Sequence, residues 1–201
     1  QLDGSTTDLF LTPPNNVGIG TTSPSTITEI KSTIPVLTLT DDQNKSWTSS
    51  DGTLGKLSFK TSDTSGIGVH EIGFISLDCN LSSSTTPNGE LVFGTAVVNA
   101  AATERMRINS SGSVLIGTTN TGWDGDADNL VVGSGSGNNG MTIYAGSSNF
   151  SQINFADSNS GAGRFTGILR YLHSINAMSF YTNGGTEALR IDSSQDAHFD
   201  Q

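Results

Sequence analysis

The sequence predicts an all-β protein built from two small tandem modules, and three observations support this prediction. Gly, Ser, Thr and Asn dominate the composition, which favours turns and short strands over long helices. The apolar residues fall in short runs that alternate with polar residues, as they do along one face of a strand. Parts of one motif recur along the chain, so the same structural unit is expected more than once.

Short strand candidates fill the regions between the repeats, and clusters of Gly, Asn, Asp and Ser separate them. The Ala-rich segment 96–106 has no amphipathic stripe, so we expect a loop or at most one turn there. Many short strands at this spacing predict small β-sandwich or meander modules. The candidates are residues 36–40, 54–60, 71–77 and 90–94 in the first half, and 129–133, 141–145, 151–156, 163–172 and 177–182 in the second.

The recurring motif is complete at residues 104–119, "ERMRINSSGSVLIGTT". Its second half matches "VGIGTT" at 17–22, and its first half matches "EALRIDSS" at 187–194. At the middle junction, strand-like residues on both sides of a turn at 109–112 predict a hairpin. We place the domain boundaries at these junctions: a connector at 1–16, β modules at 17–112 and 113–194, and the start of a following segment or C-terminal stub at 195–201.

Few residues are available for a core, because 15 Leu, 14 Ile, 9 Val and 9 Phe account for only 47 of 201 residues. Two modules of this size, each poor in apolar residues, leave sheet faces and edges uncovered. Self-association is the natural way to cover them. The sequence therefore predicts an oligomer.

The charge and the composition disfavour several partners and sites. A formal net charge of −10 disfavours nucleic acid, because phosphate binding requires clustered Lys and Arg. No apolar run approaches the roughly 18 residues that a membrane helix requires, so membrane insertion is not expected. The single cysteine, Cys79, is expected to be a buried thiol. We expect no cofactor.

Two motifs resemble ligand-binding loops but are incomplete. Residues 135–140 satisfy G-x-G-x-x-G, yet the strand-like "MTIYA" follows where a dinucleotide fold needs a helix. A hairpin turn centred on residues 138–140 is expected instead. Asp124, Asp126 and Asp128 alternate as calcium ligands do, but the glycine and the final glutamate of a calcium loop are missing. A solvated acidic loop is the simpler interpretation, so we predict no metal site and treat a bound cation as the alternative.

The sequence does not predict an enzyme. It contains no G-x-S-x-G or H-E-x-x-H motif. His70, His173 and His198 are far apart in the sequence. A pair of carboxylates across a cleft, as in glycoside hydrolases, cannot be recognised from sequence spacing, so a glycan-degrading activity stays open as an alternative.

The segments "RMRINSSGSVLIGTT", "NVGIGTTSPS" and "NLVVGSGSGNNGMTIYAG" resemble bacteriophage tail-fibre and tailspike-like proteins, particularly those of cyanophages and other aquatic phages. In these proteins a junction of the form RI(D/N)SSGxVxIGTT separates successive β modules. The resemblance implies a parallel homotrimeric fibre. It also implies a position upstream of an endosialidase-type intramolecular chaperone, although the basic start of such a domain is absent and "QDAHFDQ" is similar only to the approach to it.

The resemblance further implies a virion component that works outside the host cell and contacts other tail proteins. Its expected function is attachment to the host surface by recognising a receptor such as a glycan. Trp47, Trp123 and Tyr144 are the candidate glycan-stacking residues, and packing of these rings at the core or at the subunit seam is the alternative. The alternative functions are a structural spacer or head fibre without receptor contact, and a glycan-degrading tailspike.

Overall fold

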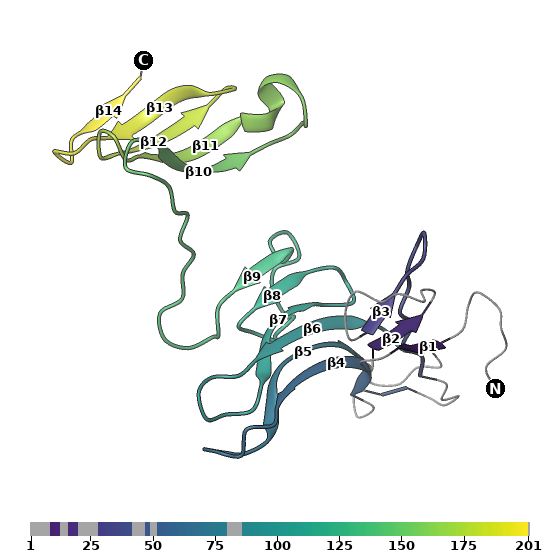
Figure 1. The fold of residues 1–201 in the computed structure, drawn as a ribbon. Helices are drawn as coiled ribbons and strands as arrows, with labels where there is room; N and C mark the ends of the chain where they lie inside the picture. The colour runs from purple at the N-terminus through teal and green to yellow at the C-terminus, as the bar shows by residue number, and fades with distance from the viewer. Residues whose placement is uncertain are drawn as a thin grey trace. The chain divides into compact units, whose positions relative to one another are not determined.

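The computed structural model describes residues 9–12, 16–19, 28–41, 47–48, 52–79 and 86–200, and these form strands, turns and one short 3₁₀ helix. Figure 1 shows the strands as curved sheets. The chain divides into two compact units, residues 1–135 and 136–201. The all-β prediction is confirmed.

The first unit contains two sheets. A three-stranded sheet has the order β1 (Leu9–Thr12), β2 (Asn16–Ile19) and β3 (Thr28–Ile30), with β1–β2 antiparallel and β2–β3 parallel. A six-stranded sheet follows the order of the chain. Its strands are β4 (Thr53–Thr61), β5 (His70–Asp78), β6 (Glu90–Thr95), β7 (Thr103–Ile108), β8 (Val114–Ile116) and β9 (Leu130–Val132). All neighbours in it are antiparallel except β8 and β9, which are parallel.

The second unit contains one five-stranded antiparallel sheet, again in chain order. Its strands are β10 (Phe150–Phe155), β11 (Gly167–Leu172), β12 (Ala177–Thr182), β13 (Thr186–Ile191) and β14 (Ala197–Phe199). The 3₁₀ helix η2 (Gly161–Phe165) lies between β10 and β11. Because these strands are antiparallel and follow the chain order, β4–β8 and β10–β14 are each a meander, and β9 adds a parallel strand to the first of them.

Most of the predicted strands are present. The exceptions are residues 36–40 and 141–145, which belong to no sheet, and residues 163–165, which lie in η2. A strand needs a neighbour to satisfy its backbone N–H and C=O groups, and the described chain places no ladder partner beside either segment. The hairpin turn expected at 138–140 is therefore also absent, and β9 pairs with β8 instead.

The structure divides the chain at a different place from the sequence. The boundary expected between residues 112 and 113 falls inside the β7–β8 hairpin, and the compact units separate after Gly135. The expected stub at 195–201 contains β14, which pairs with β13. The expected connector at 1–16 contains β1, which pairs with β2. The repeats mark hairpins within sheets, because the turn holds both of its strands in one ladder.

The repeated motif forms the same turn twice. Asn109 Oδ1 accepts hydrogen bonds from the backbone N–H groups of Ser111 and Ser113, at 3.0 and 2.8 Å. Asp192 Oδ1 accepts them from Ser194 and Asp196, at 2.8 and 3.1 Å. Both are Asx turns that close a hairpin, so the hairpin predicted at the middle junction is confirmed and recurs at the last one.

The Glu and Arg of the motif form an ion pair because each strand has a bulge. Positions i and i+3 of a regular strand point to opposite faces. The register shifts by one residue opposite Phe93 and Gly94 in β7, and opposite Phe180 and Tyr181 in β13. An extra residue in a bulge reverses the alternation. Glu104 therefore reaches Arg107, and Glu187 reaches Arg190.

Candidate assembly face and polar face

One face of the six-stranded sheet is apolar across all six strands. Residues opposite each other in neighbouring strands place their side chains on the same face, so the register defines two continuous rows. The first row contains Leu57, Ile75, Phe93, Met106, Ile116 and Val132. The second contains Leu77, Leu91, Ile108, Val114 and Leu130.

The five-stranded sheet has the same arrangement. The bulge and the Asx turn lie at the same positions relative to the strands as in the six-stranded sheet. The residues at the corresponding positions are again apolar. One row contains Ile153, Leu169, Phe180, Leu189 and Phe199, and the next contains Tyr171, Met178, Ile191 and Ala197. We call the two sets of rows the apolar faces.

The apolar faces are incompletely covered in the single chain. Seven side chains of the first set each remain 37 to 55% exposed, and Phe180 and Phe199 of the second remain 40 and 71% exposed. Soluble monomers rarely expose contiguous apolar patches beyond a few hundred Å². A sheet normally buries such a face against a second layer. In the part of the chain that the structure describes, no second sheet or helix covers these rows, and Leu39 and Trp47 lie beside them in a cavity at the β4 end.

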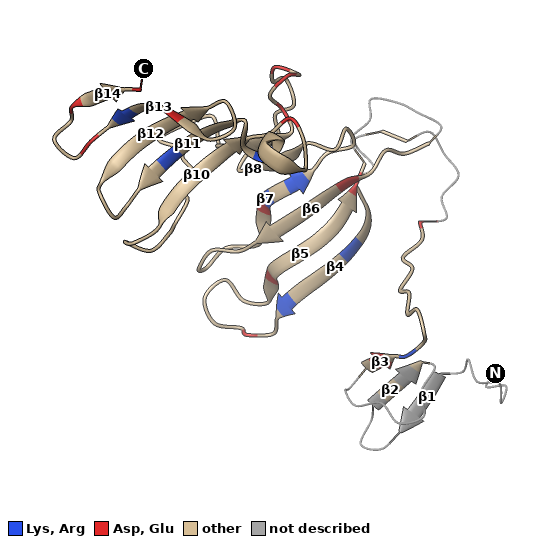
Figure 2. Ribbon diagram, turned by 90° about the horizontal axis from the view of Figure 1, so that it is seen from above, with Lys and Arg blue, Asp and Glu red and all other residues tan. Residues whose placement is uncertain are grey.

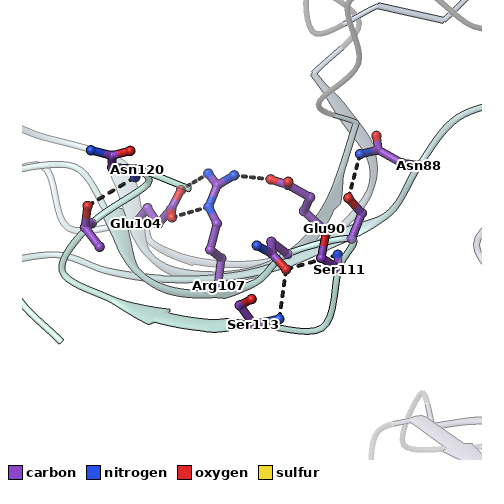
Figure 3. A network of polar contacts seen from close by, with 10 residues as sticks. Asn88, Glu90, Glu104, Arg107, Ser111, Ser113 and Asn120 are labelled. Carbon is purple, nitrogen blue, oxygen red and sulfur yellow. Dashed lines mark hydrogen bonds and ion pairs between the residues drawn. The ribbon is translucent and has the colours of Figure 1, made fainter. Parts of the chain in front are cut away.

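The opposite face of the six-stranded sheet contains a partly buried ionic network (Figure 3). Arg107 Nε and Nη2 contact the two carboxylate oxygens of Glu104 at 2.6 and 2.5 Å, and Nη1 pairs with Glu90. The hydrogen bond with Glu104 raises the pKa of Arg107, and burial opposes it. Asn88 Nδ2 also donates to Ser110 Oγ at 3.1 Å, which links the turn to the loop before β6. Because two carboxylates already pair with the guanidinium of Arg107, we interpret this network as one that stabilises the fold.

The polar face of the second sheet is different because one arginine has no acidic partner there. Gln152, Arg170, Ser179, Arg190 and His198 are aligned across the five strands. Arg190 pairs with Glu187 at 3.4 Å and His198 with Asp192 at 2.8 Å. Among the described residues, no carboxylate lies within ion-pair distance of Arg170. A cavity of about 260 Å³ opens beside its side chain.

The three predicted glycan-stacking residues lie in different surroundings. Trp47 is 6% exposed and lines an apolar cavity with Leu39 and Leu57. Trp123 is 43% exposed, and its Nε1 donates to the backbone oxygen of Asn120 at 2.6 Å. Tyr144 is 93% exposed. None of the three lines the cavity beside Arg170.

Sequence reasoning missed the residues of that cavity, although part of the signal was present. Gln152 and Asn154 alternate with Ile153 and Phe155, so one face of this strand is polar in the sequence itself. What the sequence does not reveal is the neighbour. Arg170 lies directly opposite Gln152 only because β10 and β11 pair in this register.

The acidic loop is held by its own backbone. Asp124 Oδ1 accepts from the N–H of Asp126 at 3.1 Å, and the Asp124 carbonyl accepts from Ala127 at 2.9 Å. The described residues contain no group of three or more His, Cys, Asp or Glu that could hold a metal ion. Cys79 is a free thiol and is buried, as predicted.

A Ser–His contact occurs on β10, but its geometry is not that of a nucleophile and base. Ser151 Oγ lies 3.1 Å from His173 Nε2 and donates its proton to the backbone oxygen of Ile143 at 2.9 Å. A general base must accept that proton from the hydroxyl. This contact therefore attaches the segment before β10 to the sheet.

Strands β4 and β7 each carry two basic residues, and β11 and β13 each carry one (Figure 2). These residues form no continuous stripe among the described residues. No protein-family model matches the sequence, and a search of curated proteins finds no significant match. Among the described residues, no helix has the length and apolar character needed to cross a membrane.

Proposed function

We propose that this protein is a bacteriophage tail-fibre component that assembles as a parallel homotrimer and attaches the virion to a glycan on the host surface. The observation that carries the proposal is the pair of uncovered apolar faces. Each continues across every strand of its sheet, as the face of an assembly core does. The repeated hairpin motif supports the phage assignment by resemblance.

Three copies cover these faces without leaving an open surface. A cyclic trimer closes on itself, whereas an open head-to-tail contact would continue into a filament. Three apolar faces directed to a common axis supply the second layer that each sheet lacks. The opposite faces then lie away from the axis. That of the six-stranded sheet holds the buried Val92 and Leu115 beside Arg107, and that of the five-stranded sheet holds Arg170.

Three identical binding surfaces make weak recognition sufficient, because linked sites gain affinity through avidity. Exposed Trp123 and Tyr144 are available to stack on sugar rings. We assign the protein no catalytic step. Its place is in the virion, outside the cell, where it contacts other tail proteins.

The proposal is tested by two measurements on the full chain. Light scattering coupled to gel filtration should give three times the mass of one chain, and a monomer would overturn the proposal. Labelled protein should then adsorb to cells of a panel of aquatic bacteria and compete with phage adsorption to the strain that binds it. A trimer that adsorbs to none of them would indicate a spacer or a head fibre.

A further inference from the structure

Arg170 is held in place by neutral groups. Its Nε donates to Gln152 Oε1 at 2.8 Å. Its guanidinium carbon lies 4.3 Å from the centre of the Phe150 ring and 4.7 Å from that of Tyr181, one ring on each neighbouring strand. These contacts fix the plane of the guanidinium by stacking. They leave its two terminal nitrogens without an ion-pair partner among the described residues.

The local charges make Arg170 a site for an anion. Glu187 and Asp192 of the same sheet are engaged by Arg190 and His198, so neither neutralises Arg170. A planar guanidinium binds a carboxylate through two parallel N–H···O bonds. The net charge of −10 opposes a polyanion such as nucleic acid. A ligand with widely spaced single carboxylates can pair with Arg170 and is repelled less by the net negative charge than a polyanion is.

The cavity beside Arg170 supplies the contacts that a sugar needs. Gln152 Nε2 donates to Asn154 Oδ1 at 2.7 Å, which leaves the Asn154 amide group to donate to a ligand. Phe165 forms an apolar wall of the cavity. A volume of about 260 Å³ lies below the range of drug-sized pockets and suits one pyranose ring.

Two glycines at the rim of the cavity lie close to η2. Gly184 and Gly185 have φ of +70° and +103°, values that side-chain-bearing residues rarely adopt. A Cβ on Gly185 would lie 3.4 Å from the Phe165 ring, and one on Gly184 would lie 3.1 Å from Ala162. The turn therefore packs closely against η2, and the close packing positions Phe165.

From this geometry we infer that the cavity binds a carboxylate-bearing sugar residue of a surface glycan, with Arg170 on the carboxylate, Asn154 on a hydroxyl and Phe165 against the ring. This inference rests on the proposed function, because it specifies the class of glycan that the fibre recognises. Uronate-containing polysaccharides have this chemistry.

Isothermal titration of the full protein with oligogalacturonate tests the inference, with the same oligosaccharide after reduction of its carboxyl groups as the neutral probe. The acidic probe should bind, and reduction should weaken binding at least tenfold. Arg170→Gln should also weaken it at least tenfold. Arg105→Gln removes the same charge from the other unit, at an exposed residue that contacts Thr95 Oγ1, and should bind within twofold of wild type.

Asn154→Ala changes an exposed side chain and keeps the test decisive if Arg170→Gln does not fold; it should weaken binding at least threefold. Any one of four results would overturn the inference. These are equal binding of the reduced probe, unchanged binding by Asn154→Ala, unchanged binding by folded Arg170→Gln, and no binding of oligogalacturonate to wild type. The mass and adsorption measurements are independent of this titration. A trimer that adsorbs to cells but does not bind the acidic probe would retain the proposed function and exclude this site.

Discussion

Ile75 lies in the first apolar row, between Leu57 and Phe93, and is 38% exposed in the single chain. Replacing it by Glu places a carboxylate on the proposed assembly face. We expect Ile75→Glu to abolish the trimer while the chain retains its β structure. Val98→Glu is the matched control, because Val98 is 90% exposed in the loop after β6 and lies outside the apolar faces.

The magnitude follows from the exposed fractions. Fully burying an aliphatic side chain contributes about 2 kcal/mol, so covering the seven residues that remain 37 to 55% exposed contributes about 6 kcal/mol per chain. This is comparable to the estimated cost of association. Desolvating a carboxylate costs several kcal/mol per ion. Three copies per trimer should therefore weaken assembly by more than about 4 kcal/mol, or roughly a thousandfold.

Sedimentation equilibrium over a range of concentrations measures this change, and circular dichroism measures the β content. Wild type and Val98→Glu should have the same mass, and Ile75→Glu should sediment as a monomer with a similar spectrum. If Ile75→Glu assembles as tightly as wild type, the apolar face of the first sheet is not the assembly surface. Loss of the trimer in Val98→Glu would show that the effect is not specific to that face.

Three further predictions concern the hairpins and the polar face. Gln195 and Gly112 occupy the same turn position, with φ of +71° and +91°, in a region that is strained for L residues. Gln195→Gly should therefore raise the free energy of unfolding by about 0.5 to 1 kcal/mol, and Gly112→Gln should lower it by about 1 kcal/mol. Urea unfolding measures both changes, and two changes in the same direction would contradict the prediction. Ser179 is fully buried and its Oγ has no hydrogen-bond partner among the described residues. Ser179→Ala should therefore raise the free energy of unfolding by about 1 kcal/mol, measured by thermal unfolding, and a decrease would contradict this. The hydrogen bond from His198 lowers the pKa of Asp192, and the hydrogen bond from the backbone of Asp196 adds to this effect. The carboxylate therefore stabilises the last hairpin at pH values above its unfolded pKa, and this stabilisation is lost as pH falls through the lower folded pKa. In an NMR titration, the midpoint for Asp192 should lie below the ordinary value of about 3.9 and should rise in His198→Ala; an unchanged midpoint in that variant would exclude the contact.

The local pattern of the sequence was sufficient for most strands. Residues 71–77, 90–94 and 177–182 alternate or carry β-branched and aromatic side chains, and each became a strand. The same pattern failed at 36–40 and 141–145. Those residues have strand-like side chains, but a strand also needs a neighbouring backbone, which the pattern of one segment does not encode.

The boundary between the two compact units also could not be predicted from a local pattern. The motif at 104–119 predicts a hairpin, which is present, but it does not mark the boundary between the compact units. The parallel pairing of β8 with β9 joins residues 130–132 to the six-stranded sheet. A parallel partner comes from later in the chain, after a crossover, so no local pattern reveals it.

By itself, the sequence determined the all-β class, the short strands, the hairpin at the motif and the shortage of core residues. Tertiary structure alone decided which strands are neighbours, and so which side chains share a face. Strand pairing aligned apolar residues from six strands into uncovered rows and brought Arg170 beside Gln152 and between two rings. The physical reason is that side-chain alternation depends on each strand alone, whereas register and neighbours depend on backbone hydrogen bonds between segments that are far apart in the chain.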